Sequence, residues 1–204
     1  MEKIQAVIFD LYNTLIYLAD DTKPHKGLFT AIGLQTPEEL SQAYQIATTE
    51  AFDNLADLIK RIKPSAQINL EPYQKEIEKE RASATLYPET INVLNELKKR
   101  NLPLGLISNL ASPYKKPFFD LGLNEYFNEI LFSCDAGLKK PNLKIYQEMI
   151  KKLKVEPAQA LMTGDNVKND VEGPKSIGIN AVHLDRTNTT TKSISSLEGI
   201  FLYF

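Results

Sequence analysis

The feature that most constrains the fold is a series of five short apolar runs, each of which ends in polar residues. The runs cover residues 6–9, 102–107, 130–132, 160–162 and 179–184. Short, nearly continuous apolar runs of this kind are typical of strands that are buried on both faces of a sheet. Other elements must therefore cover both faces of the sheet that these strands form.

Between these runs lie segments with the spacing of amphipathic helices. Ile91, Leu94 and Leu97 follow Pro88, and a similar series that begins with Ile145 follows Pro141. Apolar residues three or four positions apart lie on one face of a helix. Alternation of buried strands with such helices predicts an α/β fold with a doubly wound parallel sheet, of the Rossmann-like kind.

The stretch between the first two runs breaks this alternation, because its pattern is helical throughout. Thr36 is a good helix-capping residue, and Pro37 suits the first helical position. Apolar residues on one face then predict a single helix that continues to near Pro64. A further helix is expected over residues 72–84.

This helical stretch is too long for a simple connection between two strands. We therefore predict a core domain made of residues 1–17 and 87–204, and an inserted helical cap domain made of residues 18–86. A cap in this position would screen a site at the edge of the sheet from water.

Charge and cysteine content exclude several classes of protein. The formal net charge is −2 over 204 residues, so we expect no general attraction to nucleic acid or to a membrane surface. The one cysteine, Cys134, cannot form an internal disulfide. No apolar run approaches the roughly 18 residues of a membrane span. We expect a cytoplasmic globular protein.

The polar residues that end the apolar runs are the candidate site residues, because ligands bind at the carboxyl ends of strands in such sheets. Singly, each of them is better explained as an ordinary turn former or a solvated charge. Together they bring carboxylates, hydroxyls, an amide and a lysine to one edge. They are Asp10 and Thr14, Ser108 and Asn109, Lys140, and Asp165 with Asp170.

These segments, taken in order, resemble the four motifs of the haloacid dehalogenase-like (HAD) hydrolase superfamily. The resembling segments are residues 7–15, 106–109, 137–141 and 164–178. The helical insertion also lies where the smaller type of cap is found in this superfamily. The resemblance implies that Asp10 is the nucleophile and forms a covalent aspartyl intermediate.

The resemblance also assigns roles to the other candidates. Thr14, Ser108 and Asn109 would hold the group that is transferred. Lys140 would neutralise charge on that group and on Asp10.

A magnesium ion is expected at this site. Asp165 and Asp170 stand where phosphatase members of the superfamily hold Mg²⁺, with Asp10 and the main-chain carbonyl of Tyr12 as further ligands. Three carboxylates and one lysine in one pocket sum to about −2, and they would not all stay ionised without a cation. Oxygen ligands of this kind suit Mg²⁺.

Tyr12 departs from the phosphatase pattern. Phosphatase members usually carry an aspartate at this position, which protonates the leaving group and later activates water. Haloacid dehalogenases carry a tyrosine here, but they also bind the substrate carboxylate with a cap arginine, where this chain has Ser41. A phenol with a pKa of about 10 is a poor general base at neutral pH.

Three functions therefore remain open. The preferred one is a magnesium-dependent phosphatase that acts on a small phosphorylated metabolite. The alternatives are a 2-haloacid dehalogenase that needs no metal, and a domain that binds a phosphorylated ligand with little turnover. The oligomeric state and the identity of the substrate are left open.

Overall fold

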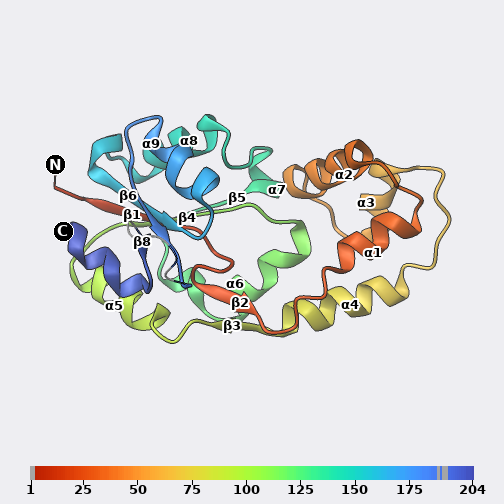
Figure 1. Ribbon diagram of the computed structural model, residues 1–204, viewed down its shortest axis with the longest axis horizontal. Coiled ribbons are helices and arrows are strands. Elements are labelled where there is room, and N and C mark those ends of the chain that lie inside the picture. Colours follow the sequence, from red (N-terminus) through yellow and green to blue (C-terminus); the bar gives the residue numbers. More distant parts are fainter. Residues whose placement is uncertain (1–2, 188, 190–192) are drawn as a thin grey trace.

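The computed structural model describes residues 3–187, 189 and 193–204 and confirms the predicted fold class. A six-stranded sheet has the order β5-β4-β1-β6-β7-β8, and every neighbouring pair in it is parallel (Figure 1). Its strands are β1 Ala6–Phe9, β4 Leu104–Ser108, β5 Glu129–Phe132, β6 Ala160–Gly164, β7 Asn180–Leu184 and β8 Ser193–Ile194. The five apolar runs of the sequence all become strands, and β8 is an additional short edge strand.

Helices cover both faces of this sheet. They are α5 Thr90–Lys99, α6 Lys116–Asp120, α7 Ser133–Ala136, α8 Leu143–Leu153 and α9 Gly173–Lys175. Short 3-10 segments η1 Ser112–Lys115, η2 Leu123–Glu125, η3 Pro157–Gln159 and η5 Leu197–Tyr203, and the π-helical segment η4 Val167–Glu172, complete this part of the chain.

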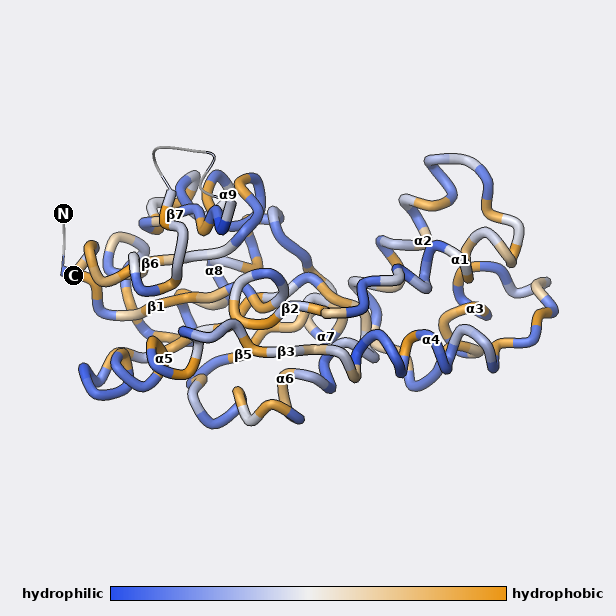
Figure 2. Tube along the Cα trace, turned by 60° about the horizontal axis from the view of Figure 1, so that its bottom comes forward, coloured by the Kyte–Doolittle hydropathy of each residue, from blue (hydrophilic) through white to orange (hydrophobic). Residues whose placement is uncertain are grey.

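The central strand β1 contributes to two hydrophobic cores, one on each face. Val7 and Phe9 belong to the core that contains α5, whereas Ala6 and Ile8 belong to the core that contains α8. All four side chains are fully buried, which explains why this strand has no polar position. Figure 2 shows the same contrast between hydrophobic central strands and more hydrophilic outer helices.

The chain leaves the sheet after β1 through an antiparallel pair of short strands, β2 Ile16–Leu18 and β3 Ala84–Leu86. Four helices lie between these two strands and extend to one side of the sheet (Figure 1). They are α1 Pro24–Ala31, α2 Pro37–Thr49, α3 Leu55–Ile62 and α4 Glu71–Ala82. They meet the rest of the molecule where α2 contacts α7 and where α4 contacts α6 and η1. The division into a core and a cap domain stays a prediction.

The prediction of one helix from Pro37 to near Pro64 is wrong. The helix begins as expected, since Thr36 accepts a hydrogen bond from the main chain of Glu39 in a capping box. It ends at Thr49, and α3 begins only after Asn54, whose side chain accepts from the amide of Asp57. Asn54 caps a new helix in preference to continuing the old one.

The helix expected over residues 72–84 is α4, which ends at Ala82, before β3 begins. The strands β2 and β3 were not predicted, because three residues are too few to show a strand period. Within the described part of the chain, none of the helices combines the length and the apolar character that a membrane crossing requires.

Candidate active site

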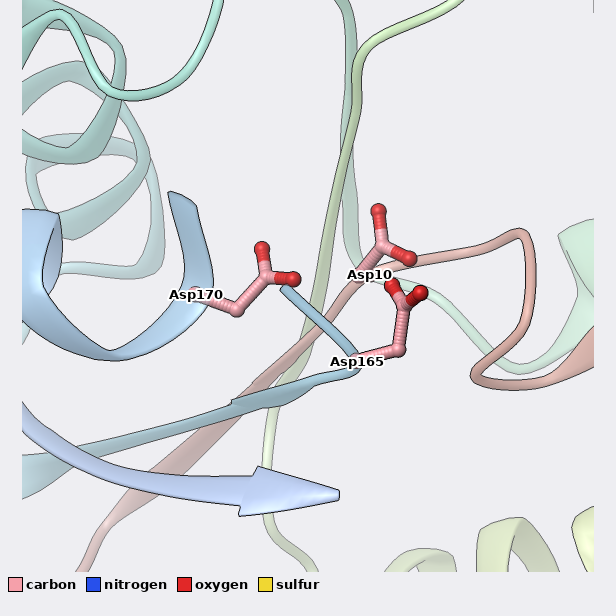
Figure 3. Close-up of side chains that lie close together, drawn as sticks. All are labelled: Asp10, Asp165 and Asp170. Atoms are coloured by element: carbon pink, nitrogen blue, oxygen red, sulfur yellow. The ribbon is translucent and has the colours of Figure 1, made fainter. Parts of the chain in front are cut away.

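Three carboxylates converge beyond the carboxyl ends of β1 and β6 (Figure 3). Asp10 directly follows β1, and its amide donates to the carbonyl of Thr163 in β6 at 3.0 Å. Asp165 directly follows β6, and Asp170 lies on η4. One carboxylate oxygen from each of the three aspartates lies within 4.8 Å of the other two. The sheet therefore brings together Asp10 from the loop after β1 and the two acids from the segment after β6.

Lys140 joins two of these acids. Its Nζ lies 2.8 Å from Oδ1 of Asp10 and 2.6 Å from Oδ1 of Asp170, and its side chain is only 2% exposed. Burial alone would lower the pKa of Lys140, but the two carboxylates together more than offset burial, so the pKa lies above its usual value. The lysine is therefore held as a cation at the centre of the cluster.

The other predicted residues surround this cluster in different ways. Thr14 donates from Oγ1 to Oδ2 of Asp10 at 3.1 Å. Ser108 is buried as the last residue of β4, the strand beside β1. Asn109 makes two 2.8 Å hydrogen bonds with the main chain of Lys140, donating to its carbonyl and accepting from its amide. Asn109 thus positions Lys140, and the roles of these residues toward a substrate stay predictions.

A short π-helical turn places Asp170. Asn166 caps the turn by accepting from the amide of Asn169, and its own amide donates to Oδ2 of Asp170 at 3.0 Å. Burial raises the pKa of Asp170, and it also raises the pKa of Asp165, with a further contribution from the charge of Asp10 in each case. These two carboxylates are therefore costly to keep ionised by themselves.

The side chain of Tyr12 is engaged away from the cluster. Its hydroxyl donates to the main-chain carbonyl of Tyr114 at 2.9 Å. Burial raises the pKa of Tyr12 above its usual value near 10. This phenol is consequently unsuited to proton transfer near neutral pH. The proposed ligand role of the Tyr12 main-chain carbonyl stays a prediction.

A comparison with protein families decides the relationship of this chain. The model of the haloacid dehalogenase-like hydrolase family matches residues 4–178. The chain belongs to the haloacid dehalogenase-like hydrolase family.

Several relatives and solved structures resemble this hydrolase. It is 29% identical to a glyceraldehyde 3-phosphate phosphatase of Methanopyrus kandleri, over 90% of this chain and 84% of the relative. Several other curated relatives align over less than half of their own length.

Two solved structures share the fold with a TM-score of 0.69. One is a 2-haloacid dehalogenase of Pseudomonas syringae, 21% identical, which matches over 98% of this chain and 97% of that chain. The other is a HAD family enzyme of Bacteroides thetaiotaomicron in complex with magnesium, 16% identical, which matches over 93% and 98%.

Arg186 is a residue of this hydrolase that the sequence analysis missed. Its guanidinium donates to the carbonyl of Thr14 at 2.7 Å and to that of Asn13 at 3.4 Å. It also pairs with Glu89 at 2.7 Å and lies over the ring of Tyr87, 3.4 Å from the ring centroid. Arg186 therefore holds the loop that carries Thr14 beside Asp10. The available signal was a lone arginine two residues after an apolar run.

Gly164 offers a test of the placement of Asp170. A Cβ added at Gly164 would lie 2.4 Å from Cγ of Asp170, so Gly164→Ala must displace that carboxylate from Lys140. We expect a loss of about 1–3 kcal/mol in the free energy of unfolding, and a fall in turnover of roughly 10²-fold for a displacement near 1 Å. Urea unfolding and steady-state assays measure the two effects.

Gly27→Ala is the matched control, since its added Cβ would make only an ordinary contact at 3.7 Å. Wild-type activity in Gly164→Ala would contradict the packing described for Asp170.

Arg186→Met tests the support of the loop after Asp10. We expect a loss of about 1–3 kcal/mol in stability, because the variant leaves buried hydrogen-bonding groups without partners, together with a marked fall in kcat. Arg186→Lys should recover part of kcat, since it restores the charge but not the several parallel donors.

Arg100→Met is the control. Arg100 also forms an ion pair, in its case with Glu96, and its guanidinium also stacks on an aromatic ring, that of Phe201. If Arg186→Met and Arg100→Met lose stability and activity to the same extent, Arg186 does not specifically support the loop after Asp10.

Proposed function

We propose that this hydrolase is a magnesium-dependent phosphatase that cleaves a small phosphate monoester through an aspartyl-phosphate intermediate on Asp10. One observation carries the proposal: carboxylate oxygens of Asp10, Asp165 and Asp170 lie within 4.8 Å of one another, and the buried Lys140 contacts two of these acids. Three carboxylates and one ammonium group carry a formal charge of about −2 at neutral pH. A divalent cation would balance that charge.

The donor set fits Mg²⁺. All three side chains offer hard carboxylate oxygens, which this ion prefers. The raised pKa values of Asp165 and Asp170 agree with the proposal, because burial and the nearby charge of Asp10 make both carboxylates costly to keep ionised without a bound cation. Asp10, Asp165, Asp170 and the main-chain carbonyl of Tyr12 would hold the ion. When bound, it would supply positive charge to the phosphate oxygens of the substrate.

The residues of the chain perform the remaining steps. Lys140 and Thr14 bind the two oxygens of the Asp10 carboxylate and so orient it for attack on phosphorus. The bond between Asp10 and phosphorus forms as the bond from phosphorus to the leaving oxygen breaks. Water then attacks phosphorus, which releases inorganic phosphate and regenerates the carboxylate. Ser108, which ends the neighbouring strand β4, would bind the phosphate.

The substrate is proposed to be a small phosphorylated metabolite. The phosphatase from Methanopyrus kandleri, which aligns over most of both chains, supports this class. The formal charge of −2 gives no reason to expect a nucleic acid or a membrane surface as partner. We include a cytoplasmic location in the proposal.

Dehalogenation is the less favoured function, because the cap arginines are engaged elsewhere. Arg61 pairs with Asp57 at 2.8 Å and with Glu50 at 3.3 Å. Arg81 lies 3.7 Å from Glu78 and lines a different cavity from the one bordered by Tyr12. Neither arginine lines the cavity beside Tyr12, which argues against binding of a haloacid carboxylate there.

A metal-dependence assay tests the proposed function. We expect phosphate release from p-nitrophenyl phosphate and sugar phosphates only with Mg²⁺, and no halide release from 2-haloacids.

Asp10→Asn should abolish turnover, because an amide is a far weaker nucleophile. Asp165→Asn should raise the Mg²⁺ concentration needed for half-maximal rate. The ion should also raise the Tm of the wild type, since it binds only the native state.

Metal-independent halide release would establish the dehalogenase alternative. A Tm that rises with phosphorylated ligands, without release of either product, would indicate a binding domain.

Tyr12 predicts a strong dependence on the leaving group. Its hydroxyl is bound to Tyr114, so it supplies no proton to the departing oxygen. Aryl phosphates, which depart with little protonation, should be cleaved much faster than alkyl phosphates. Tyr12→Asp should selectively accelerate alkyl phosphates, by up to the roughly 10²- to 10⁴-fold of general acid catalysis. Measured kcat values for both series check this, and equal wild-type rates on both would show that another residue supplies the proton.

A further inference from the structure

A cavity of about 330 Å³ lies beside the acidic cluster. Tyr12 and Asn13 line it from the loop after β1, and Asn109 lines it from the loop after β4. Tyr44 of α2 and His25 of α1 also line it. A substrate whose phosphate lies at Asp10 would place its leaving group here, and the volume suits a small organic group.

Most polar groups of the cavity wall already have partners within the protein. The side-chain amide of Asn13 donates to Asp165, and Asn109 binds the main chain of Lys140. The hydroxyl of Tyr12 donates to Tyr114, and that of Thr48 donates to the carbonyl of Tyr44. A leaving group would therefore meet chiefly aromatic rings and the apolar residues Leu18, Ala47, Leu110 and Ala111.

The charge of the lining is negative. Among the residues that the structure describes, no lysine or arginine lines the cavity, whereas Asp21 does. Burial lowers the pKa of His25 to about 4, so its ring adds no positive charge at pH 7. Oδ2 of Asp21 lies 3.7 Å from Nζ of Lys23. This ion pair is weak, because both side chains are more than half exposed to water.

We propose that the leaving group of the substrate carries no negative charge and is favoured when it carries an ammonium group. This inference rests on the proposed phosphatase function and extends it to a substrate class. A carboxylate or second phosphate in this cavity would lose hydration without gaining a cationic partner. An ammonium group would gain attraction from Asp21 and from the faces of the tyrosine rings. We expect substrates with uncharged alkyl or aryl leaving groups to have kcat/KM values between those of the ammonium and carboxylate substrates.

Three phosphate esters of matched shape test the proposal. They are phenyl phosphates with a para ethyl chain that ends in an ammonium, a hydroxyl or a carboxylate group. The ethyl spacer keeps the acidity of the three phenols similar, so differences in kcat/KM report the far end of the molecule. We expect the order ammonium, hydroxyl, carboxylate, with steps of about 2- to 5-fold, as for partly exposed charges.

Substitutions at Asp21 separate its charge from its shape. Asp21→Asn should remove the advantage of the ammonium ester over the hydroxyl ester. Asp21→Lys should reverse the order, so that the carboxylate ester becomes the best of the three. Asp53→Lys is the matched control, since Asp53 is an exposed acid between α2 and α3 that lines another cavity. The control should keep the wild-type order.

The outcomes separate this inference from the function on which it rests. Cleavage of p-nitrophenyl phosphate with equal rates for the three esters, or with the carboxylate ester preferred, would overturn only the inference. A change of order in Asp53→Lys as large as that in Asp21→Lys would also overturn it. Failure to cleave any phosphate ester, including p-nitrophenyl phosphate, would overturn the proposed function together with the inference.

Discussion

The buried contact of Lys140 with Asp10 and Asp170 is the interaction on which the rest of the site depends. It joins three loops that follow different strands, and removal of the lysine charge would leave the two carboxylates buried without compensation. The surrounding structure keeps the lysine in place, because Asn109 holds its main chain from the neighbouring loop. The small volume at Gly164 leaves room for Asp170. Several residues far apart in sequence therefore hold Lys140 and its two carboxylate partners in contact.

Tyr12 has a structural role, at a position where the resemblance to phosphatase members implies an aspartate. Its hydroxyl binds the carbonyl of Tyr114, and the hydroxyl of Tyr114 in turn donates to Glu80 on α4. Glu80 is buried and also accepts from the amide of Lys23. The loop after the proposed nucleophile is thus linked through hydrogen bonds to the helices between β2 and β3. The hydrogen bond from Tyr12 to Tyr114 also leaves the Tyr12 hydroxyl unsuited to acid-base catalysis.

The sequence predicted those parts of the fold whose signal is local. Buried strands such as β1 are visible as apolar runs, and the residues that end them are adjacent to the runs, so Asp10 and Asp165 could be found directly. The break between α2 and α3 was missed because apolar spacing continues across it, while the cap at Asn54 decides the outcome. Arg186 was missed because its partner carbonyls at Asn13 and Thr14 lie more than 170 positions away. Long-range contacts to main-chain groups leave no pattern in a single sequence.

In the proposed function, the acidic cluster and the neighbouring cavity bind different parts of the substrate and favour opposite charges. The acidic cluster would bind a phosphate only through added positive charge, because three carboxylates are accompanied by one lysine. The neighbouring cavity offers rings, apolar groups and Asp21, and would discriminate by shape and by charge sign. A dianionic phosphate must therefore be accepted at one end, while a negative charge is rejected at the other. Phosphorylated carboxylic acids satisfy the first demand and fail the second, which makes the charge of the leaving group the main point of discrimination among small phosphate esters.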